Sequence, residues 1–333
     1  MMNGKKWIAL CALLLLCGTA FALGWGKKKN LEPLRRQSWG LQTVLNFTLY
    51  GGTEEIMNGA LAKIKDYEGM LDRNLPAELG RLNARQETKP SAELAGLIQR
   101  SLQRGKLLEG ALDVTLGQIV ELWNFGSDSP YVPSTEELQT LLPSTGLDKV
   151  MIEDGQVRMT HSDTKLDLGA VAKGFVADQL KDYFLAQGVK AGVIDLGGNV
   201  LTFGAKPDGK PWVIGLRDPK GGSESVAYWV FEGSAAIVTS GVYERGFSRQ
   251  GEFYHHLLDP KSGMPAHVGL DAVTVKAQSA ELADGLSTGL FVLGHDRAVK
   301  VQEEHFPDVT AVYFGTDGTV RVFGPEKGQV QQR

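Results

Sequence analysis

Both cysteines of this 333-residue chain, Cys11 and Cys17, lie close to its N-terminus. The rest of the chain therefore has no disulfide and no thiolate chemistry, and its fold must depend on a hydrophobic core. A chain of this length can bury roughly three quarters of its unfolded surface, enough for one large domain or two smaller ones. The 42% hydrophobic content argues against disorder. The balance of 35 Lys and Arg against 39 Asp and Glu argues against a nucleic-acid-binding surface.

The N-terminal residues have the pattern of an export signal. The basic pair Lys5-Lys6 precedes an apolar run from Trp7 to Cys17. This run is too short to span a bilayer comfortably, but it fits the hydrophobic region of a secretory signal. We therefore expect an exported protein with a signal at residues 1–22, a tether at residues 23–36 and a folded domain at residues 37–325.

Three fates of this signal are open. Cleavage before Cys17 would give a lipoprotein, cleavage after Ala22 an ordinary exported protein, and no cleavage a hydrophobic anchor. We rank lipidation of Cys17 first, because Gly18 and the basic residues 27–29 suit a tethered protein. The expected location is the periplasmic side of the inner membrane, with the lipid at Cys17 as membrane anchor.

The folded domain combines helical and strand patterns. Apolar residues recur at helical spacing between Ile56 and Leu71 and between Leu94 and Leu102, and Ser134 with Glu137 forms a capping-box pattern. Asp154-Gly155 predicts a hairpin. Strands are expected at residues 191–195, 212–216, 228–231, 253–258, 272–276 and 309–314, and helices near residues 170–185 and 279–293. The lack of a regular βαβ alternation favours an α+β fold with mixed, largely antiparallel sheets and flanking helices.

Common catalytic motifs are absent from the sequence. It contains no Walker A loop, no G-x-G-x-x-G fingerprint after a strand and no G-x-S-x-G elbow. Its six histidines are not paired at the spacing of a zinc site. The chemistry must therefore come from less familiar segments.

The first such segment runs from Lys165 to Phe175. A strand is expected to end at Asp167, and a helix then begins with Lys173 in its first turn. The N–H groups of that helix N-terminus and Lys173 would attract an anion, while Asp167 could accept hydrogen bonds from the edge of a ring. An N-capped helix with a solvated lysine is an equally good interpretation.

Two further segments offer candidate groups. Asp284 and Thr288 are four residues apart on a helix, so their oxygens share one face and would suit magnesium, although Thr288 could instead bond to the Asp284 carbonyl within the helix. His256 could act as a general base. The nearby Asp259-Pro260 pair indicates a turn.

Together these segments resemble the ApbE family, the FAD:protein FMN transferases. The resemblance extends from about residue 71 to residue 294, and its motifs occur in the family order. They are Ala111-Leu-Asp-Val-Thr-x-Gly117, Leu122-Trp-x-Phe-Gly126, Asp167-Leu-Gly-x-x-Ala-Lys-Gly174, Leu196-Gly-Gly198, Thr239-Ser-Gly-x-Tyr243, His256-x-x-Asp-Pro-x-x-Gly263 and Ala283-Asp-x-x-Ser-Thr288. Each motif is weak alone, but their shared order is specific.

The resemblance implies an ApbE-like, T-fold-like architecture and a magnesium-dependent transferase. Such an enzyme would move FMN from FAD to a threonine hydroxyl of an exported redox protein and release AMP. The implied Mg²⁺ ligands are Asp284, Thr288 and the carbonyl of Ala170. The implied FAD contacts are Ala111, Leu112, Asp113, Asp167, Lys173 and Leu258. His256 would deprotonate the threonine, which would lie in a Ser/Thr-Gly-Ala-Thr-like segment of the acceptor.

Two segments depart from the family pattern. Residues 37–41 replace a Met-Gly-Thr-like segment, and residues 74–83 lack the serines that usually precede Asn83. The isoalloxazine contacts and the choice of acceptor are therefore open. Two other functions also remain open: magnesium-dependent hydrolysis of FAD to FMN and AMP, and a non-catalytic FAD-binding lipoprotein.

Overall fold

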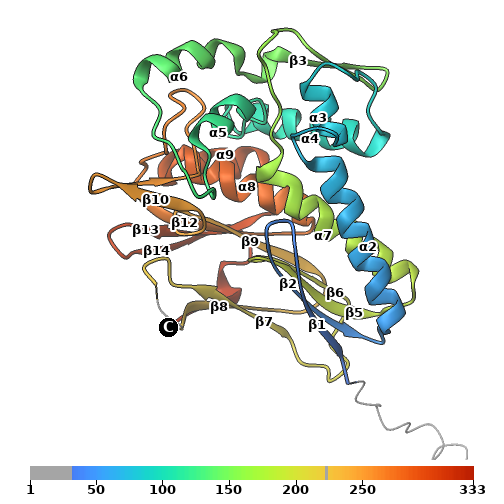
Figure 1. Cartoon of the computed structure of the whole chain (residues 1–333). Helices are drawn as coiled ribbons and strands as arrows, with labels where there is room; N and C mark the ends of the chain where they lie inside the picture. Colours follow the sequence, from blue (N-terminus) through green and yellow to red (C-terminus); the bar gives the residue numbers. More distant parts are fainter. Residues whose placement is uncertain (1–31, 222–223) are drawn as a thin grey trace, which may run out of the picture.

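The computed structural model describes residues 32–221 and 224–333 (Figure 1). The predicted export signal, Cys17 and most of the predicted tether lie outside these residues. Strand β1 (Leu34–Gly40) begins inside the predicted tether, and β15 (Val330–Gln332) pairs with β8 beyond residue 325, so the folded body is longer at both ends than expected. Among the described helices, none combines the length and the apolar character that a bilayer crossing requires.

A large antiparallel sheet forms the centre of the described structure. Its eight strands lie in the order β1-β2-β5-β6-β9-β12-β13-β14. They are β1, β2 (Thr43–Tyr50), β5 (Ala191–Leu196), β6 (Asn199–Phe203), β9 (Ala235–Gly241), β12 (Leu270–Ala277), β13 (Thr310–Gly315) and β14 (Val320–Phe323). Neighbouring strands are antiparallel throughout. This confirms the predicted fold class.

The central sheet is covered on both faces, because its side chains alternate between two hydrophobic clusters. In β12, Val273 and Val275 pack in the larger cluster beneath the helices, whereas Ala272 faces the smaller one. A second sheet supplies the smaller cluster, with the buried Trp212 and Trp229. Its strands are β7 (Trp212–Arg217), β8 (Ser225–Phe231) and β15, in the order β15-β8-β7.

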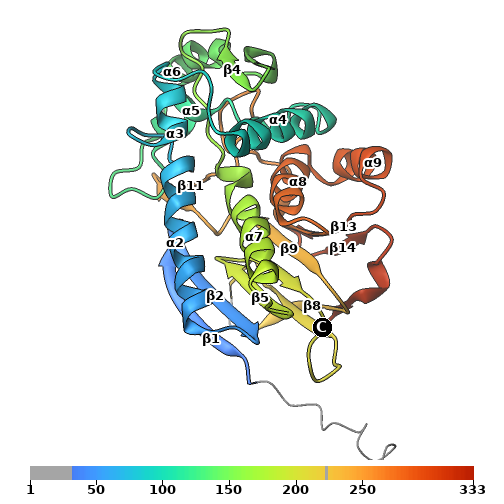
Figure 2. The ribbon, with the colours of Figure 1, turned by 90° about the vertical axis from the view of Figure 1, so that its right-hand side faces the viewer.

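Helices cover the opposite face of the central sheet. Figure 2 shows α2, α7 and α8 side by side above the strands. Helix α7 carries Phe175 and Phe184 into the larger cluster, where Phe184 contacts Phe47 of β2. The helices of this layer are α2 (Glu54–Leu71), α7 (Gly169–Ala186), α8 (Ala280–Leu293) and α9 (His295–His305).

A smaller, mostly helical cap lies over one end of this layer (Figure 1). Its core contains Trp123, Ile119 and Leu138, and the indole N–H of Trp123 donates to the carbonyl of Gly263. The cap and its neighbouring hairpin contain α3 (Glu78–Asn83), α4 (Ala92–Leu107), α5 (Gly117–Trp123), α6 (Thr135–Leu141), β3 (Val150–Glu153), β4 (Gln156–Met159), β10 (Gly246–Arg249) and β11 (Glu252–His255). The predicted capping box of Ser134 and Glu137 is confirmed at the start of α6.

One predicted strand is wrong in its extent. The strand expected at residues 253–258 ends at His255. The turn at Asp259, where Gly263 N–H donates to the Asp259 carbonyl at 2.8 Å, folds the chain back. Leu258 therefore bridges Pro265 instead of extending β11.

The two central helices touch at Gly174. A Cβ atom on Gly174 would lie 2.2 Å from the carbonyl oxygen of Ala280 and 2.8 Å from Cβ of Asp284. Glycine is thus required by the approach of two backbones rather than by a turn.

We expect Gly174→Ala to lower the free energy of unfolding by about 3 kcal/mol, because the added methyl group meets a backbone carbonyl that cannot rotate away. Urea denaturation of the full chain measures this loss. Gly69→Ala is the matched control, since Gly69 is an exposed helical residue with no atom near its potential Cβ, and it should raise the stability by up to about 1 kcal/mol. Equal behaviour of the two variants would contradict the packing argument.

Candidate functional site

Asp167 lies at the N-terminus of α7, where both its carboxylate oxygens have partners. Oδ1 accepts the N–H of Gly169 at 2.8 Å, and Oδ2 accepts from Nη1 of Arg73 at 2.7 Å. The backbone N–H of Asp167 donates to the carbonyl of Val114. The N-cap residue of α7 is Leu168, which makes no side-chain capping bond, and Asp167 holds the first N–H of the helix from the position before it. The ion pair with Arg73 is an addition that the sequence analysis missed.

Asn83 is a second residue that the sequence analysis did not assign to the site. Its side-chain amide donates to the carbonyl of Leu166 at 2.9 Å and accepts the N–H of the same residue at 2.8 Å. These two bonds hold the backbone next to Asp167 from the end of α3. No local signal identifies such a partner, because 83 residues separate it from Leu166.

The first turns of α7 meet α8 at Asp284. The N–H of Gly174, which in a regular helix donates to the carbonyl of Ala170, donates to Oδ2 of Asp284 at 2.8 Å. Ala170 lies four residues, about one helical turn, before Gly174 on α7, and its carbonyl has two lone pairs, so it can accept from a second partner. The structure thus brings two of the three predicted metal ligands to the same contact between helices.

Thr288 lies one turn beyond Asp284 on α8. Its hydroxyl is 3.0 Å from Oγ of Ser240 on β9, which also contacts Oγ of Ser287 at 2.8 Å. The alternative in which Thr288 bonds to the Asp284 carbonyl is wrong, because Ser287 makes that bond at 2.9 Å. Ser240 belongs to the Thr239-Ser240-Gly241 motif, and the structure shows why that motif accompanies the Asp284 segment.

Asp284 is only 4% exposed, so its carboxylate is a buried ionisable group. Burial raises its pKa, and the charge of Lys173 with hydrogen bonding from Gly174 and Asn199 opposes that rise. Asn199 is 1% exposed, and neither its amide nitrogen nor its amide oxygen has a hydrogen-bond partner of good geometry among the described residues. The buried carboxylate thus lies beside an amide whose hydrogen-bonding groups are free to bind a ligand.

These groups fit a magnesium ion. The carboxylate of Asp284, the hydroxyl of Thr288 and the carbonyl of Ala170 are hard oxygen donors on adjacent helical turns. The described residues contain no group of three or more His, Cys, Asp or Glu side chains suited to a metal. A single carboxylate favours an ion that takes its remaining ligands from water and substrate oxygens, as magnesium does.

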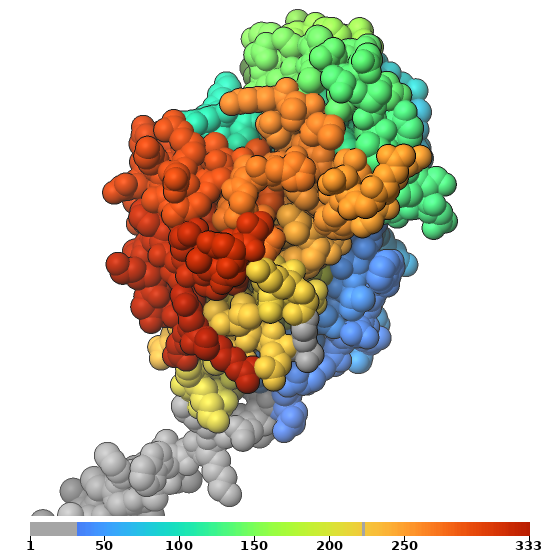
Figure 3. Space-filling model, turned by 90° about the vertical axis from the view of Figure 1, so that its left-hand side faces the viewer, coloured from blue at the N-terminus to red at the C-terminus, as the bar shows by residue number. Residues whose placement is uncertain are grey.

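His256 follows β11 immediately and is half-buried. In Figure 3 the orange segment that contains the β10–β11 hairpin lies between the green cap and the blue strands β1 and β2. Its Nδ1 is 3.1 Å from the carbonyl oxygen of Arg245. Because a carbonyl oxygen only accepts, the proton is on Nδ1 and the lone pair is on Nε2. Burial lowers the pKa of His256 to about 3; the hydrogen bond with the Arg245 carbonyl opposes this, and the charges of Arg245 and Lys173 add to the lowering. The imidazole is therefore neutral at neutral pH.

Its neighbour His255 belongs to the core instead. The imidazole of His255 is 4% exposed and packs edge-on against Phe291 of α8. At most one of the two consecutive histidines can therefore face the site.

The remaining predicted FAD contacts are arranged differently. Ala111 is buried, and the side chains of Leu112 and Leu258 are buried in hydrophobic clusters, so these three residues can offer a ligand only backbone atoms. Oδ1 of Asp113 accepts from the N–H and the hydroxyl of Thr115, at 2.8 and 2.6 Å. That carboxylate therefore stabilises its own turn, and the predicted FAD contact of Asp113 remains a prediction.

We expect the imidazole proton signals of His256 to stay constant between about pH 5 and about pH 8, because the group is neutral throughout that range. Nuclear magnetic resonance measures this, with His256→Gln to assign the signals. Between about pH 3 and about pH 6.5 the unfolded state binds more protons at this residue, so its contribution makes the folded chain less stable as the pH falls. A titration midpoint near pH 6.5 would contradict the assignment.

The chain is similar in sequence to several known proteins. An FAD:protein FMN transferase of Treponema pallidum (strain Nichols) is 35% identical over 261 residues, covering 73% of this chain and 72% of that protein. An FAD:protein FMN transferase of Vibrio cholerae is 31% identical over 332 residues, covering 94% of this chain and 95% of that protein.

Solved structures give the same result. The crystal structure of the ApbE protein from Thermotoga maritima has a TM-score of 0.79 and 30% identity, covering 87% of this chain and 96% of that one. The flavin transferase ApbE from Vibrio cholerae has a TM-score of 0.76 and 28% identity, covering 88% and 96%. The ApbE family model matches residues 41–313. Because this match spans most of its length, the chain belongs to the ApbE family.

Proposed function

We propose that this protein is an FAD:protein FMN transferase that requires magnesium. It transfers FMN from FAD to a threonine hydroxyl of an acceptor protein and releases AMP. The observation that carries the proposal is the buried carboxylate of Asp284, held by the N–H of Gly174 with the Thr288 hydroxyl and the Ala170 carbonyl one turn away on either helix. Family membership and the names of the relatives support the same reaction.

The reaction exchanges one phosphoester partner for another. The acceptor oxygen forms a bond to the phosphorus of the FMN half, and the bond from that phosphorus to the bridging oxygen of the pyrophosphate breaks. The bridging oxygen leaves with AMP, and the proton of the hydroxyl goes to a base. No redox change occurs, so positioning and charge neutralisation carry most of the catalysis.

Different residues of the chain would bind the metal, neutralise the pyrophosphate and bind FAD. When bound, Mg²⁺ would neutralise charge on the pyrophosphate, and Asp284, Thr288 and the Ala170 carbonyl would hold it. Lys173 would add positive charge as the fifth residue of the 18-residue helix α7, whose N-terminus favours an anion. Asp167 is fixed by Arg73 and Gly169 beside that N-terminus and would bind FAD.

His256 is the proposed base. Its Nε2 carries the lone pair, since Nδ1 donates to Arg245. A pKa of about 3 makes His256 a weak base in the absence of ligand. Because an anion nearby favours the protonated imidazole, a bound pyrophosphate would raise this pKa toward the range useful for catalysis.

The acceptor and the location complete the proposal. The sequence contains no Ser/Thr-Gly-Ala-Thr segment, so we propose that such a segment belongs to a separate exported redox protein. We further propose that the chain is anchored by a lipid at Cys17 on the periplasmic side of the inner membrane. No nucleic acid takes part.

We expect the mature chain in the membrane fraction to begin at an acylated Cys17, and intact-mass spectrometry tests this. A mature chain that begins at Leu23 without acyl mass would show ordinary signal cleavage instead.

We expect Asp284→Ala to reduce AMP release from FAD by at least about 100-fold, because the substitution removes the carboxylate ligand of the metal. The assay incubates the full chain with FAD and Mg²⁺, with and without a peptide that carries the acceptor threonine. Asp66→Ala is the control, since Asp66 is exposed on α2, and it should leave AMP release unchanged.

The same assay separates the candidate activities. Release of AMP only with the peptide, together with the mass of FMN on the peptide, supports transfer. Release without the peptide indicates hydrolysis of FAD, and no AMP in either case indicates a non-catalytic flavin-binding protein. Full activity of Asp284→Ala would show that the metal is bound elsewhere.

A further inference from the structure

Helices α7 and α8 contact each other along two matching stripes of residues. On α7 the stripe contains Ala170, Gly174 and Asp178, each four residues apart, and on α8 it contains Ala280, Asp284 and Thr288. Residues at this spacing share one face of a helix. The proposed metal ligands thus belong to the same stripes as Gly174 and Asp178.

The contacts between these stripes show that the helices run antiparallel. Asp178 lies at the start of α8, Gly174 lies between Ala280 and Asp284, and Val171 lies beside Gly285. The stripes therefore run in opposite directions, and Ala170 is level with the Thr288 end of α8. Any shift of α8 along its axis changes the separation between the Ala170 carbonyl and the two ligands on α8.

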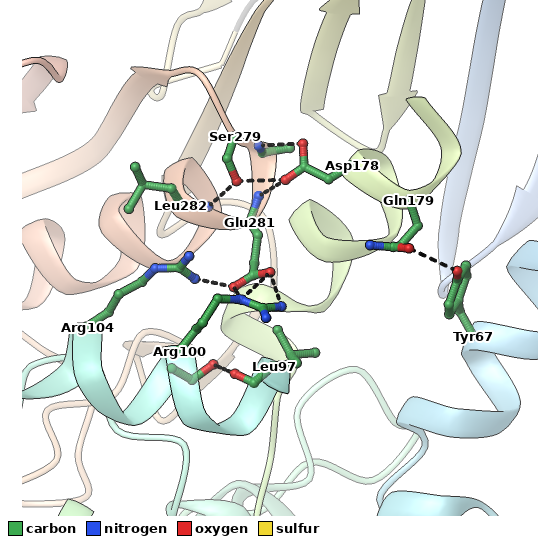
Figure 4. Close-up of polar contacts among 11 residues, drawn as sticks. Tyr67, Leu97, Arg100, Arg104, Asp178, Gln179, Ser279, Glu281 and Leu282 are labelled. Carbon is green, nitrogen blue, oxygen red and sulfur yellow. Dashed lines mark hydrogen bonds and ion pairs between the residues drawn. The ribbon is translucent and has the colours of Figure 1, made fainter. Parts of the chain in front are cut away.

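Asp178 holds the first turn of α8 in place. Its Oδ1 accepts the N–H of Ala280 at 3.1 Å, and its Oδ2 accepts the N–H of Glu281 at 3.0 Å and the hydroxyl of Ser279 at 2.7 Å (Figure 4). Ser279 in turn accepts the N–H of Leu282. A carboxylate from another helix thus caps α8 through charge-assisted bonds, which are stronger than neutral ones.

Glu281 fixes the same turn from the opposite side. Its carboxylate is buried, accepts two bonds from Arg100 of α4, at 2.8 Å from Nε and 2.7 Å from Nη2, and also pairs with Arg104 (Figure 4). Removing either side of such a pair leaves an uncompensated buried charge. The N-terminus of α8 is therefore fixed both to α7 and to the cap.

The geometry of a metal site makes this register important. A helix rises about 1.5 Å per residue, whereas magnesium requires oxygen ligands at about 2.0–2.1 Å in near-ideal octahedral positions. A slip of α8 by a single residue would separate Asp284 and Thr288 from the Ala170 carbonyl by more than the site tolerates. The cap at Asp178 lies one and a half turns from Asp284 and opposes such a slip.

We propose that Asp178 is a positioning residue for the metal site, because it fixes the register of α8 against α7 and so sets the affinity for Mg²⁺. The inference rests on the proposed function, since it takes Asp284 and Thr288 as metal ligands. Asp178 acts through α8 and does not itself touch the metal.

The test measures Mg²⁺ binding to the full chain by calorimetry, with FAD at saturation and without acceptor, together with the urea midpoint. We expect Asp178→Ala to weaken Mg²⁺ binding by roughly 10- to 100-fold. Asp178→Asn keeps one capping oxygen and should show a smaller loss. It also serves as the folded variant if Asp178→Ala does not fold.

The control is Ser134→Ala, which removes the serine N-cap from α6, a helix that carries no proposed ligand. It should lower the urea midpoint but leave Mg²⁺ affinity unchanged. Lys181→Ala removes the ion pair of Asp178, at 3.5 Å, while keeping the cap, and should also leave Mg²⁺ affinity unchanged.

The outcomes separate this inference from the proposed function. Asp284→Ala serves as the reference, and it should abolish Mg²⁺ binding. Unchanged binding in Asp284→Ala would overturn the metal site itself. Loss of binding in Asp284→Ala with unchanged binding in both Asp178 variants would overturn only the positioning role. An equal loss of affinity in Ser134→Ala would show a general effect of stability and would also overturn it.

Discussion

The contact between α7 and α8 at Gly174 is the constraint on which the rest of the site depends. Because Gly174 has no side chain, the backbones approach until its N–H reaches the carboxylate of Asp284 at 2.8 Å. This approach places the N-terminal part of α7, which contains Ala170 and Lys173, next to the turn of α8 that contains Asp284. The central sheet supports both helices from below, and its alternating side chains leave no freedom to separate them.

Electrostatics explains how a mildly acidic chain can bind a pyrophosphate. The formal net charge is −4, so the whole surface does not attract an anion. Positive potential is instead concentrated at Lys173, at the N-terminus of α7 and at the metal that Asp284 would hold. The cost is a buried carboxylate whose pKa is raised by burial, and the bonds from Gly174 and the charge of Lys173 offset part of that cost.

Much of the fold followed from local patterns. The periods of apolar residues identified α2, α4, α7 and α8, and Asp154-Gly155 identified the β3–β4 hairpin. Strands β1, β2, β6, β9, β10, β14 and β15 were missed. In β1 the half-buried Arg36 and Ser38 are polar and the exposed Trp39 is apolar, and β9 is buried on both faces, so neither strand shows a period of two in apolar residues. Strand β11 ends at His255, before the predicted end at residue 258, because the turn at Asp259 pairs Leu258 with Pro265. Strand propensity does not encode such a pairing.

The sequence by itself determined the order of the motifs, the family resemblance and the residue types able to bind magnesium and FAD. It could place Asp284 and Thr288 on one face because they share a helix. Only the tertiary structure decided which distant groups meet them: Ser240 at Thr288, Asn83 and Arg73 around Asp167, and Asp178 at the start of α8. These partners are far apart in sequence, and helical or strand periodicity describes neighbours along one element, whereas the packing of whole elements brings separate ones together.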